Sequence, residues 1–270
     1  MIHTANAVID EMKGMADEKR RQTLMKFFKT GKGEYGEGDK FLGLRVPQVR
    51  GVAKKHHDME RGEIYSLLQS DLHDARLCAL LILAAQFDSL CGRRMTDDAE
   101  AMEKRDDIVN FYVGNAARAN NWDLVDLSAP KIPGRWLVMP SRLTSREKTE
   151  VIDRLADSGN LWKERISMVC TWEPLRHGDP SHTLRYAERH LHHPHDLMHK
   201  AVGWMLREMG KLAGMEILRS FLESHAATMP RTTLRYAIER MDDDERRRWM
   251  DAGRHGQTLP TRLQTNAPGK

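Results

Sequence analysis

The stretch Asp196-Leu-Met-His-Lys-Ala-Val-Gly-Trp-Met-Leu-Arg-Glu-Met-Gly-Lys-Leu212 has the clearest helical pattern in the chain. Its apolar side chains recur at intervals of three and four residues and share one helix face: Met198, Val202, Met205, Met209 and Leu212. The opposite face carries three cations and an indole: Lys200, Trp204, Arg207 and Lys211. Because an indole is costly to expose, Trp204 either packs under a neighbouring helix or belongs to a binding surface.

A related pattern recurs along the chain at positions 165, 200 and 235, a spacing of 35 residues. Arg165, Lys200 and Arg235 each lie early in the second helix of a predicted pair, and Arg76 is a weaker match. Helix pairs repeated every ~35–45 residues are typical of α-solenoids, which place corresponding residues in a row. We therefore predict an all-α, HEAT-like solenoid of stacked antiparallel helix pairs. Its cationic row either matches a phosphate backbone or makes local ion pairs.

The rest of the chain also has helical rather than strand character, since no segment shows sustained alternation of β-branched and aromatic residues. We expect one repeat domain over residues 1–252 and a polar, disordered tail over 253–270. Gly, Pro and Asn predict breaks at Gly31–Gly38, Pro130–Pro140, Pro174–Pro180, Pro194 and Pro230. The predicted helices are 4–14, 17–29, 46–56, 60–69, 73–89, 97–112, 121–129, 144–157, 160–172, 180–191, 196–212, 213–223, 230–241 and 243–252.

Composition indicates a soluble, reduced, cytoplasmic protein. The 270 residues include 43 Lys and Arg against 39 Asp and Glu, a net charge of +4 that permits nucleic-acid binding without requiring it. The three cysteines form no Cys-x-x-Cys pair, so neither a disulfide framework nor a cysteine zinc site is indicated. No apolar run approaches the length of a membrane span, and the first residues lack a signal-peptide pattern.

Two motif-like stretches lack the context that their chemistry requires. Gly31-Lys-Gly-Glu-Tyr-Gly36 fits G-x-G-x-x-G, but no strand precedes it and no βαβ unit surrounds it, so a dinucleotide site is not expected. Histidines crowd the segment 190–199, yet it contains no H-E-x-x-H motif and Pro194 interrupts it. We predict no metal and no cofactor.

The segment Asn120-Asn-Trp-Asp-Leu-Val-Asp126 combines a helix start with an indole and a carboxylate. Either Asn can cap the helix, and Trp122 and Asp126, four residues apart, share a face. An indole beside a carboxylate suits a cationic sugar or base, because both attract positive charge. Alternatively, Asp126 acts as a cap or pairs with Arg165 or another basic residue. Asp123, in the first turn, is explained by the helix dipole.

Arg165 is the anomaly of the predicted helix 160–172. It lies in the middle of an apolar stripe that consists of Leu161, Met168, Val169 and Trp172. A guanidinium in that position needs a partner, which is either a buried carboxylate or an external anion. The sequence leaves both partners open.

Several stretches carry a family resemblance: Phe27-Phe28 with Gly38–Pro47, Trp122–Asp126, Leu161–Arg165 and His199–Glu208. At these residues the chain resembles the bacterial DNA alkylation repair glycosylases of the AlkD type, over about residues 20–250. The resemblance implies a HEAT-like solenoid that curves around duplex DNA and cleaves the N-glycosidic bonds of purines alkylated at N3 or N7. It further implies that the damaged nucleotide need not be flipped into a pocket.

The resemblance also implies roles for individual residues. In that family a Trp and an Asp on one helix, an Arg on another and a Trp on a third converge on the lesion, which here corresponds to Trp122, Asp126, Arg165 and Trp204. Asp126 would stabilise the oxocarbenium-like sugar and position water, the two indoles would cradle the sugar, and Arg165 would hold a phosphate. The candidates for contacts with the DNA backbone are Lys200, Arg207, Lys211 and Arg235.

Two other functions fit the same sequence. One is a non-catalytic binder of damaged or branched DNA, and the other is a HEAT-like scaffold whose basic row meets an acidic protein. The leading interpretation is a DNA glycosylase that acts on positively charged alkylated purines, with duplex DNA as its partner. We expect it to act as a monomer without an obligate protein partner.

Overall fold

The computed structural model describes residues 3–255, and within this range the chain is helical with no strand. The predicted all-α, solenoid-like fold is therefore confirmed. A single isolated bridge joins Lys40 to Leu72. The described residues divide into two compact units, with the boundary between His182 and Thr183, and each is described by itself. None of the described helices is long and apolar enough to cross a membrane.

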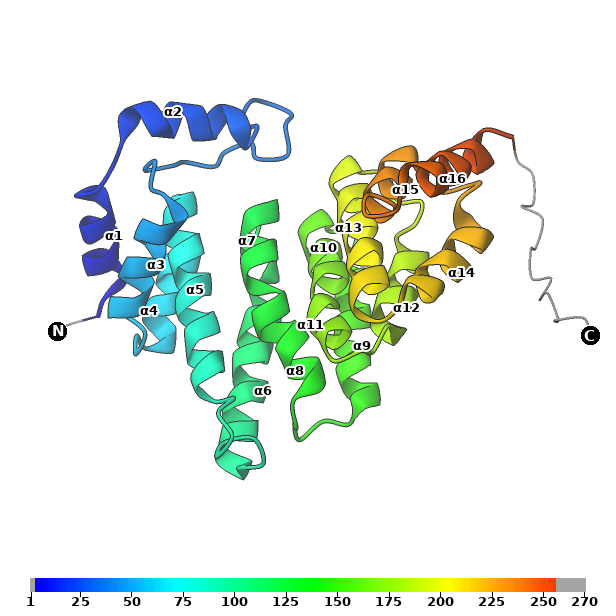
Figure 1. The fold of residues 1–270 in the computed structure, drawn as a ribbon. Coiled ribbons are helices and arrows are strands. Elements are labelled where there is room, and N and C mark those ends of the chain that lie inside the picture. Colours follow the sequence, from blue (N-terminus) through cyan, green and yellow to red (C-terminus); the bar gives the residue numbers. More distant parts are fainter. Residues whose placement is uncertain (1–2, 256–270) are drawn as a thin grey trace, which may run out of the picture. The chain divides into compact units, whose positions relative to one another are not determined.

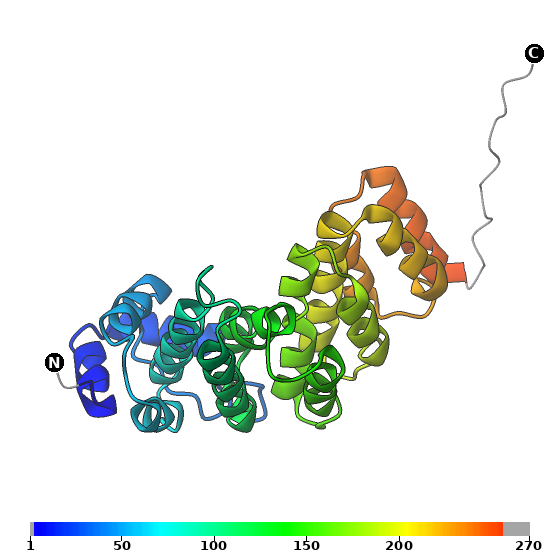
Figure 2. The same ribbon diagram turned by 90° about the horizontal axis from the view of Figure 1, so that it is seen from below.

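The first unit is built from two layers of helices. One layer contains helices that touch one another in order, and the other contains their antiparallel partners, while α2 runs crosswise to them (Figures 1 and 2). The first layer consists of α3 (Val46–Lys55), α5 (His73–Ser89), α7 (Trp122–Ser128) and α10 (Leu161–Val169). The partners are α4 (Arg61–Leu68), α6 (Ala99–Gly114) and α9 (Ser145–Ala156). The remaining elements are α1 (Ala5–Lys13), α2 (Glu18–Phe27), η1 (Ala116–Arg118), η2 (Pro130–Gly134), α8 (Arg135–Val138) and α11 (Trp172–Arg176).

Helix α5 forms the centre of this unit because neighbours cover it on nearly all sides. Its apolar residues from Ala75 to Ala84 are buried. Contacts with α3, α4, α6 and α7 account for this burial. Burying one such aliphatic side chain stabilises the fold by roughly 1.5–3 kcal/mol, so α5 fixes the spacing of the helices on either side of it.

The predicted break over Pro130–Pro140 is wrong, because the chain continues there as η2 and α8. Pro133 has no N–H with which to bond the carbonyl oxygen of Ala129. The amide of Gly134, one residue later, donates to that oxygen at 2.9 Å and makes η2 a π-helical turn. Consequently α7, η2 and α8 follow one another along the chain without a loop.

Gly134 also brings this helical run close to the next one. A Cβ atom at Gly134 would lie 2.4 Å from the carbonyl oxygen of Cys170, between α10 and α11. Any larger residue would force the two backbones apart. The break predicted at Pro174–Pro180 likewise begins too early, because Pro174 lies in the first turn of α11, where the absent N–H has no helical acceptor.

The second unit contains the helices after the boundary. Helix α12 (Ser181–Arg189) begins at the boundary and is followed by α13 (Asp196–Leu212), α14 (Met215–His225), α15 (Arg231–Ala237) and α16 (Asp243–His255). The apolar stripe predicted for α13 is buried at Met198, Val202, Met205 and Met209. Helix α16 extends to His255, so the predicted tail begins too early, and residues 256–270 lie outside the described residues.

Candidate functional site

Trp122 and Asp126 lie on α7, whose start is set by Asn121. The Asn121 side chain accepts a hydrogen bond from the Trp122 amide at 2.9 Å, which identifies Asn121 as the cap of the helix. Leu124 and Val125 are fully buried, and they turn the opposite face of α7 towards the core. The four-residue spacing therefore leaves Trp122 and Asp126 partly exposed on one side, as the sequence predicted.

Asp126 and Arg165 form a bidentate ion pair between α7 and α10. The Arg165 Nε donates to Oδ1 of Asp126 at 3.0 Å, and Nη2 donates to Oδ2 at 2.9 Å. The Arg165 side chain is 5% exposed and that of Asp126 is 18% exposed, so the carboxylate is the member of the pair that solvent or a ligand can reach. Of the two partners that the sequence left open for Arg165, the structure shows the carboxylate.

Burial raises the pKa of the Asp126 carboxyl above its usual range. The neighbouring charge of Asp123 acts in the same direction, and Arg165 opposes both. Two charge-assisted hydrogen bonds from one guanidinium also fix the orientation of the carboxylate plane. The pair therefore presents a carboxylate of fixed orientation that is partly shielded from water. An electrostatic interaction with a cation is stronger there than in bulk water.

Aromatic rings surround the indole of Trp122. The ring of Phe28 stacks on it, with centroids 5.3 Å apart and planes at 24°, and Phe27 meets it edge-on at 5.9 Å. Phe27 is 61% exposed although it is a large apolar residue. The glycine-rich segment Gly31–Gly38 follows α2. Its Tyr35 ring meets the Trp162 ring of α10 edge-on, with ring centroids 6.2 Å apart. The segment thus reaches from α2 to α10 and is part of the surroundings of the site.

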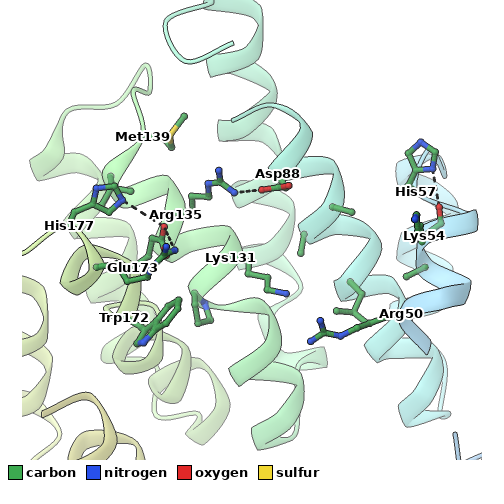
Figure 3. Close-up of a pocket in the computed structure, with 17 residues that line it drawn as sticks. Arg50, Lys54, His57, Asp88, Lys131, Arg135, Met139, Trp172, Glu173 and His177 are labelled. Atoms are coloured by element: carbon green, nitrogen blue, oxygen red, sulfur yellow. Dashed lines mark hydrogen bonds and ion pairs between the residues drawn. The ribbon is translucent and has the colours of Figure 1, made fainter. Parts of the chain in front are cut away.

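A groove of about 980 Å³ lies in the same unit (Figure 3). Its walls come from α3, α5, the η2–α8 run and α11. Five Lys and Arg residues line it, against two acidic residues. The cations are Arg50, Lys54, Lys131, Arg135 and Arg176, and the acids are Asp88 and Glu173.

Part of this positive charge is not neutralised within the groove. Arg135 pairs with Asp88, and Arg176 pairs with Glu173 at 3.1 Å. Lys131 and Arg50 instead extend towards each other (Figure 3), and both burial and the Arg50 charge lower the pKa of Lys131. Two cations that repel each other across a groove favour an anionic ligand, because it would relieve their repulsion.

The groove lies further along the two helical runs that carry the Asp126–Arg165 pair. On the α7–η2–α8 run, Asp126 is followed by the groove residues Pro130 and Arg135, and the π-helical turn adds one residue between these two. On the α10–α11 run, Arg165 is followed by the groove residues Trp172 and Arg176. At ~1.5 Å per residue, Arg135 lies roughly 13 Å beyond Asp126 along the helix. The sequence analysis missed these groove residues. For Arg176 the signal was the eleven-residue spacing from Arg165, which the assumed break at Pro174 concealed.

The other candidate residues lie in the second unit. Trp204 is half-buried on α13, and Lys200 pairs with Asp196 at 2.8 Å. Arg207 contacts Glu208 and Glu239, while Lys211 lies 3.8 Å from Glu208. Arg235 is exposed on α15. Within this unit Lys200, Arg207 and Lys211 thus each have an acidic partner.

The two motif-like stretches form local structure. The amide of Gly31 donates to Glu34, and the amide of Gly33 donates to Glu37. In the histidine segment, Nδ1 of His195 accepts a hydrogen bond from the Leu197 amide at the start of α13. Among residues 3–255 no cluster of three or more His, Cys, Asp or Glu side chains is arranged to hold a metal ion.

Comparison with known proteins agrees with this fold. The family model described as DNA alkylation repair enzyme matches residues 8–241, and the chain therefore belongs to the DNA alkylation repair enzyme family. A solved structure described as a predicted DNA alkylation repair enzyme from Enterococcus faecalis is similar, with a TM-score of 0.60 and 13% identity over 84% of this chain and 97% of that one. No curated protein sequence matches significantly. Family membership indicates a role in alkylation repair with DNA as the substrate.

Proposed function

We propose that this protein is a DNA glycosylase that hydrolyses the N-glycosidic bond of positively charged alkylated purines in duplex DNA. The observation that carries the proposal is the Asp126 carboxylate, which Arg165 holds through two hydrogen bonds beside the indole of Trp122. It belongs to a chain of the DNA alkylation repair enzyme family. An oriented carboxylate next to an aromatic face suits a cationic sugar better than it suits a neutral or anionic group.

One carboxylate is sufficient for this chemistry. Purines alkylated at N3 or N7 already carry positive charge, so the base leaves without the general acid that ordinary glycoside hydrolysis requires. As the bond to the base breaks, positive charge moves onto the deoxyribose ring, where ionised Asp126 stabilises it and orients the attacking water. Arg165 keeps the carboxylate aimed at this position, which replaces the role as a phosphate contact that the sequence suggested.

The indoles supply the walls of the site in this proposal. Trp122 presents the part of its ring that Phe28 does not cover, and exposed Phe27 adds a second apolar surface beside it. Trp204 is the further indole that we propose for the sugar. It is tested with Trp204→Phe, which keeps a ring while reducing the attraction for a cation.

The basic groove is the proposed surface for the DNA backbone next to the lesion. Duplex DNA carries one negative charge per ~1.7 Å of its axis, so a groove roughly 13 Å from Asp126 faces several phosphates. Lys131 and Arg50 are the strongest candidates because their charges face each other. Lys200, Arg207, Lys211 and Arg235 of the second unit remain proposed backbone contacts.

Release of 7-methylguanine from a duplex under single-turnover conditions tests the function. We expect release by the wild-type protein and a loss of about 100- to 1000-fold in Asp126→Asn, the scale seen when an electrostatic stabiliser of a transition state is removed. Duplex affinity should remain within about twofold. Asp153→Asn, on α9, is the matched control and should keep full activity.

Three outcomes distinguish the alternatives. Release that disappears only in Asp126→Asn supports the proposal. Salt-dependent DNA binding without release from any of several alkylated duplexes contradicts it and indicates a non-catalytic DNA binder. If the protein neither binds DNA nor releases a base, the protein-interaction scaffold is the function that fits.

A further inference from the structure

A buried histidine lies between two carboxylates beneath the proposed site. His73 is the first residue of α5 and is 3% exposed. Its Nδ1 lies 3.1 Å from Oδ2 of Asp39, and its Nε2 lies 2.9 Å from Oδ2 of Asp123. Because an ionised carboxylate only accepts hydrogen bonds, both ring nitrogens donate and the ring is an imidazolium. Burial by itself would lower the pKa of His73, but the two acids together outweigh it and raise this pKa to about 9.

Asp39 extends this contact to the start of α7. Its Oδ2 also accepts from Asn121 at 3.2 Å, and its Oδ1 accepts from Asn120 at 3.3 Å and from Arg76 at 2.5 Å. Asn121 is the cap of α7, and Asp123 is in the first turn of that helix. The same buried cluster therefore holds three positions that flank Trp122, namely Asn120, Asn121 and Asp123, and the helix dipole explains only Asp123.

A stack of rings makes a second connection between His73 and Trp122. His73 stacks on Phe41, with centroids 4.4 Å apart, and Phe41 stacks on Phe28 at 5.1 Å. Phe28 in turn stacks on Trp122. Polar contacts and ring stacking thus both lead from His73 to the residues of the proposed site.

The charge of the cluster also reaches Asp126. Asp123 lies three residues before Asp126 on α7, and its negative charge disfavours ionisation of Asp126. The charges that face His73 are Asp39, Asp74, Arg76 and Asp123, and those that face Asp126 are Arg165 and Asp123. Loss of the His73 charge would remove the cation that contacts Asp123 directly, so more of the Asp123 charge would act on Asp126.

We propose that His73 is a positioning residue for the reaction: as a buried imidazolium it clamps Asp39 and Asp123, fixes the start of α7 and offsets the Asp123 charge next to Asp126. The role in catalysis rests on the proposed function. The clamp itself belongs to the fold and is measured without turnover. We call the cluster of Asp39, His73, Arg76 and Asp123 the buried clamp.

Two variants of the clamp are expected to shift the pKa of Asp126 in opposite directions. His73→Gln removes a positive charge, so the Asp126 pKa rises and the acidic limb of the rate–pH profile moves up by about half to one pH unit. Asp123→Asn removes a negative charge, so the same limb moves down by about half a unit. The wild-type rate should also fall near pH 9 as His73 loses its proton, and His73→Gln should lack this alkaline limb.

Positioning is measured separately by amide hydrogen exchange at residues 122–128 at pH 7. We expect at least tenfold faster exchange in His73→Gln and a smaller increase in Asp123→Asn, which keeps an acceptor for Nε2. The Asp126 pKa is read directly from carboxyl carbon NMR. These measurements need no DNA, so they decide the clamp proposal even if the wild-type protein releases no base and the proposed function fails.

The matched control is His56→Gln. His56 is also buried, at 5% exposure, and also contacts a carboxylate, Glu11, at 3.1 Å, but through α1 rather than α7. It should leave the pH limbs and the exchange of residues 122–128 unchanged. The proposal is overturned if both clamp variants lose rate equally at every pH with unmoved limbs, or if α7 exchanges at the wild-type rate in His73→Gln. If His73→Gln fails to fold, Asp123→Asn alone tests the proposal, because its acidic limb of the rate–pH profile must move to lower pH.

Discussion

Two carboxylates, one turn apart on α7, belong to charged regions of different kinds. Asp123, whose side chain is 12% exposed, joins the buried clamp, in which the side chains of Asp39, His73 and Arg76 are at most 3% exposed. Asp126 pairs with Arg165 and keeps 18% of its side chain exposed. Each region contains ionised groups with several hydrogen bonds. Because the two carboxylates differ little in their own exposure, their partners separate them: His73 ties Asp123 to a cluster in the core, whereas Asp126 is held by one guanidinium at the edge of the proposed site.

The buried clamp should be the more sensitive of the two regions to loss of a partner. Arg76→Met keeps most of the side-chain volume but removes the guanidinium that donates to Asp39 and to the Ser70 carbonyl. We expect the free energy of unfolding to fall by about 3–5 kcal/mol, the cost of leaving a buried charge without its partner. Chemical denaturation measures it. Arg146→Met, in the exposed α9 pair with Glu150, should cost under about 0.5 kcal/mol, and equal losses would contradict the distinction.

The clamp should also give stability an alkaline limit. The folded-state pKa of His73 is raised from 6.5 to about 9, so its stabilisation is complete below pH 6.5 and is lost as pH rises through 9. The loss should approach about 3 kcal/mol. Lys148, whose buried amine has a pKa lowered to about 8, acts in the opposite direction between pH 8 and 10.5. The measurement is therefore the difference in the free energy of unfolding between the wild type and His73→Gln. This difference should become steadily smaller from pH 6.5 to 9. A difference independent of pH would show that His73 does not titrate there.

Removing one cation from the groove should have the smallest effect. Lys131→Ala is expected to weaken duplex binding several-fold and to reduce the slope of log affinity against log salt by about 0.9, the share of one phosphate. Fluorescence anisotropy at several salt concentrations measures both. Arg154 is an exposed residue of α9 outside the groove, so Arg154→Ala is the control and should leave the slope unchanged. If the slope is unchanged in Lys131→Ala, the proposal that the groove binds DNA is contradicted.

Helical periodicity was sufficient where a helix has one buried face or begins and ends in clear signals. The predictions for 73–89 and 196–212 agree with α5 and α13 at both ends. It failed at Pro130–Pro140, because whether a proline breaks a helix depends on which donor replaces its missing N–H. Here Gly134 supplies that donor, and only the packed backbone shows it.

The candidate site divides in the same way. Trp122, Asp126 and Arg165 stood out in the sequence because each is a polar or aromatic side chain at a position that helical spacing makes conspicuous. The basic groove and the buried clamp did not, since their members come from segments far apart in the chain. His73 and Asp123 are 50 residues apart, and Asp39 and Asn121 are 82 apart.

The sequence by itself determined the helical fold class, the face shared by Trp122 and Asp126, and the need of Arg165 for a partner, because these follow from spacing along a single helix. Only the tertiary structure decided that Arg165 pairs with Asp126, that His73 joins two carboxylates, and that the cations of four helical segments line one groove. Those contacts depend on which helices become neighbours, and this is set by packing of the whole core rather than by any local pattern.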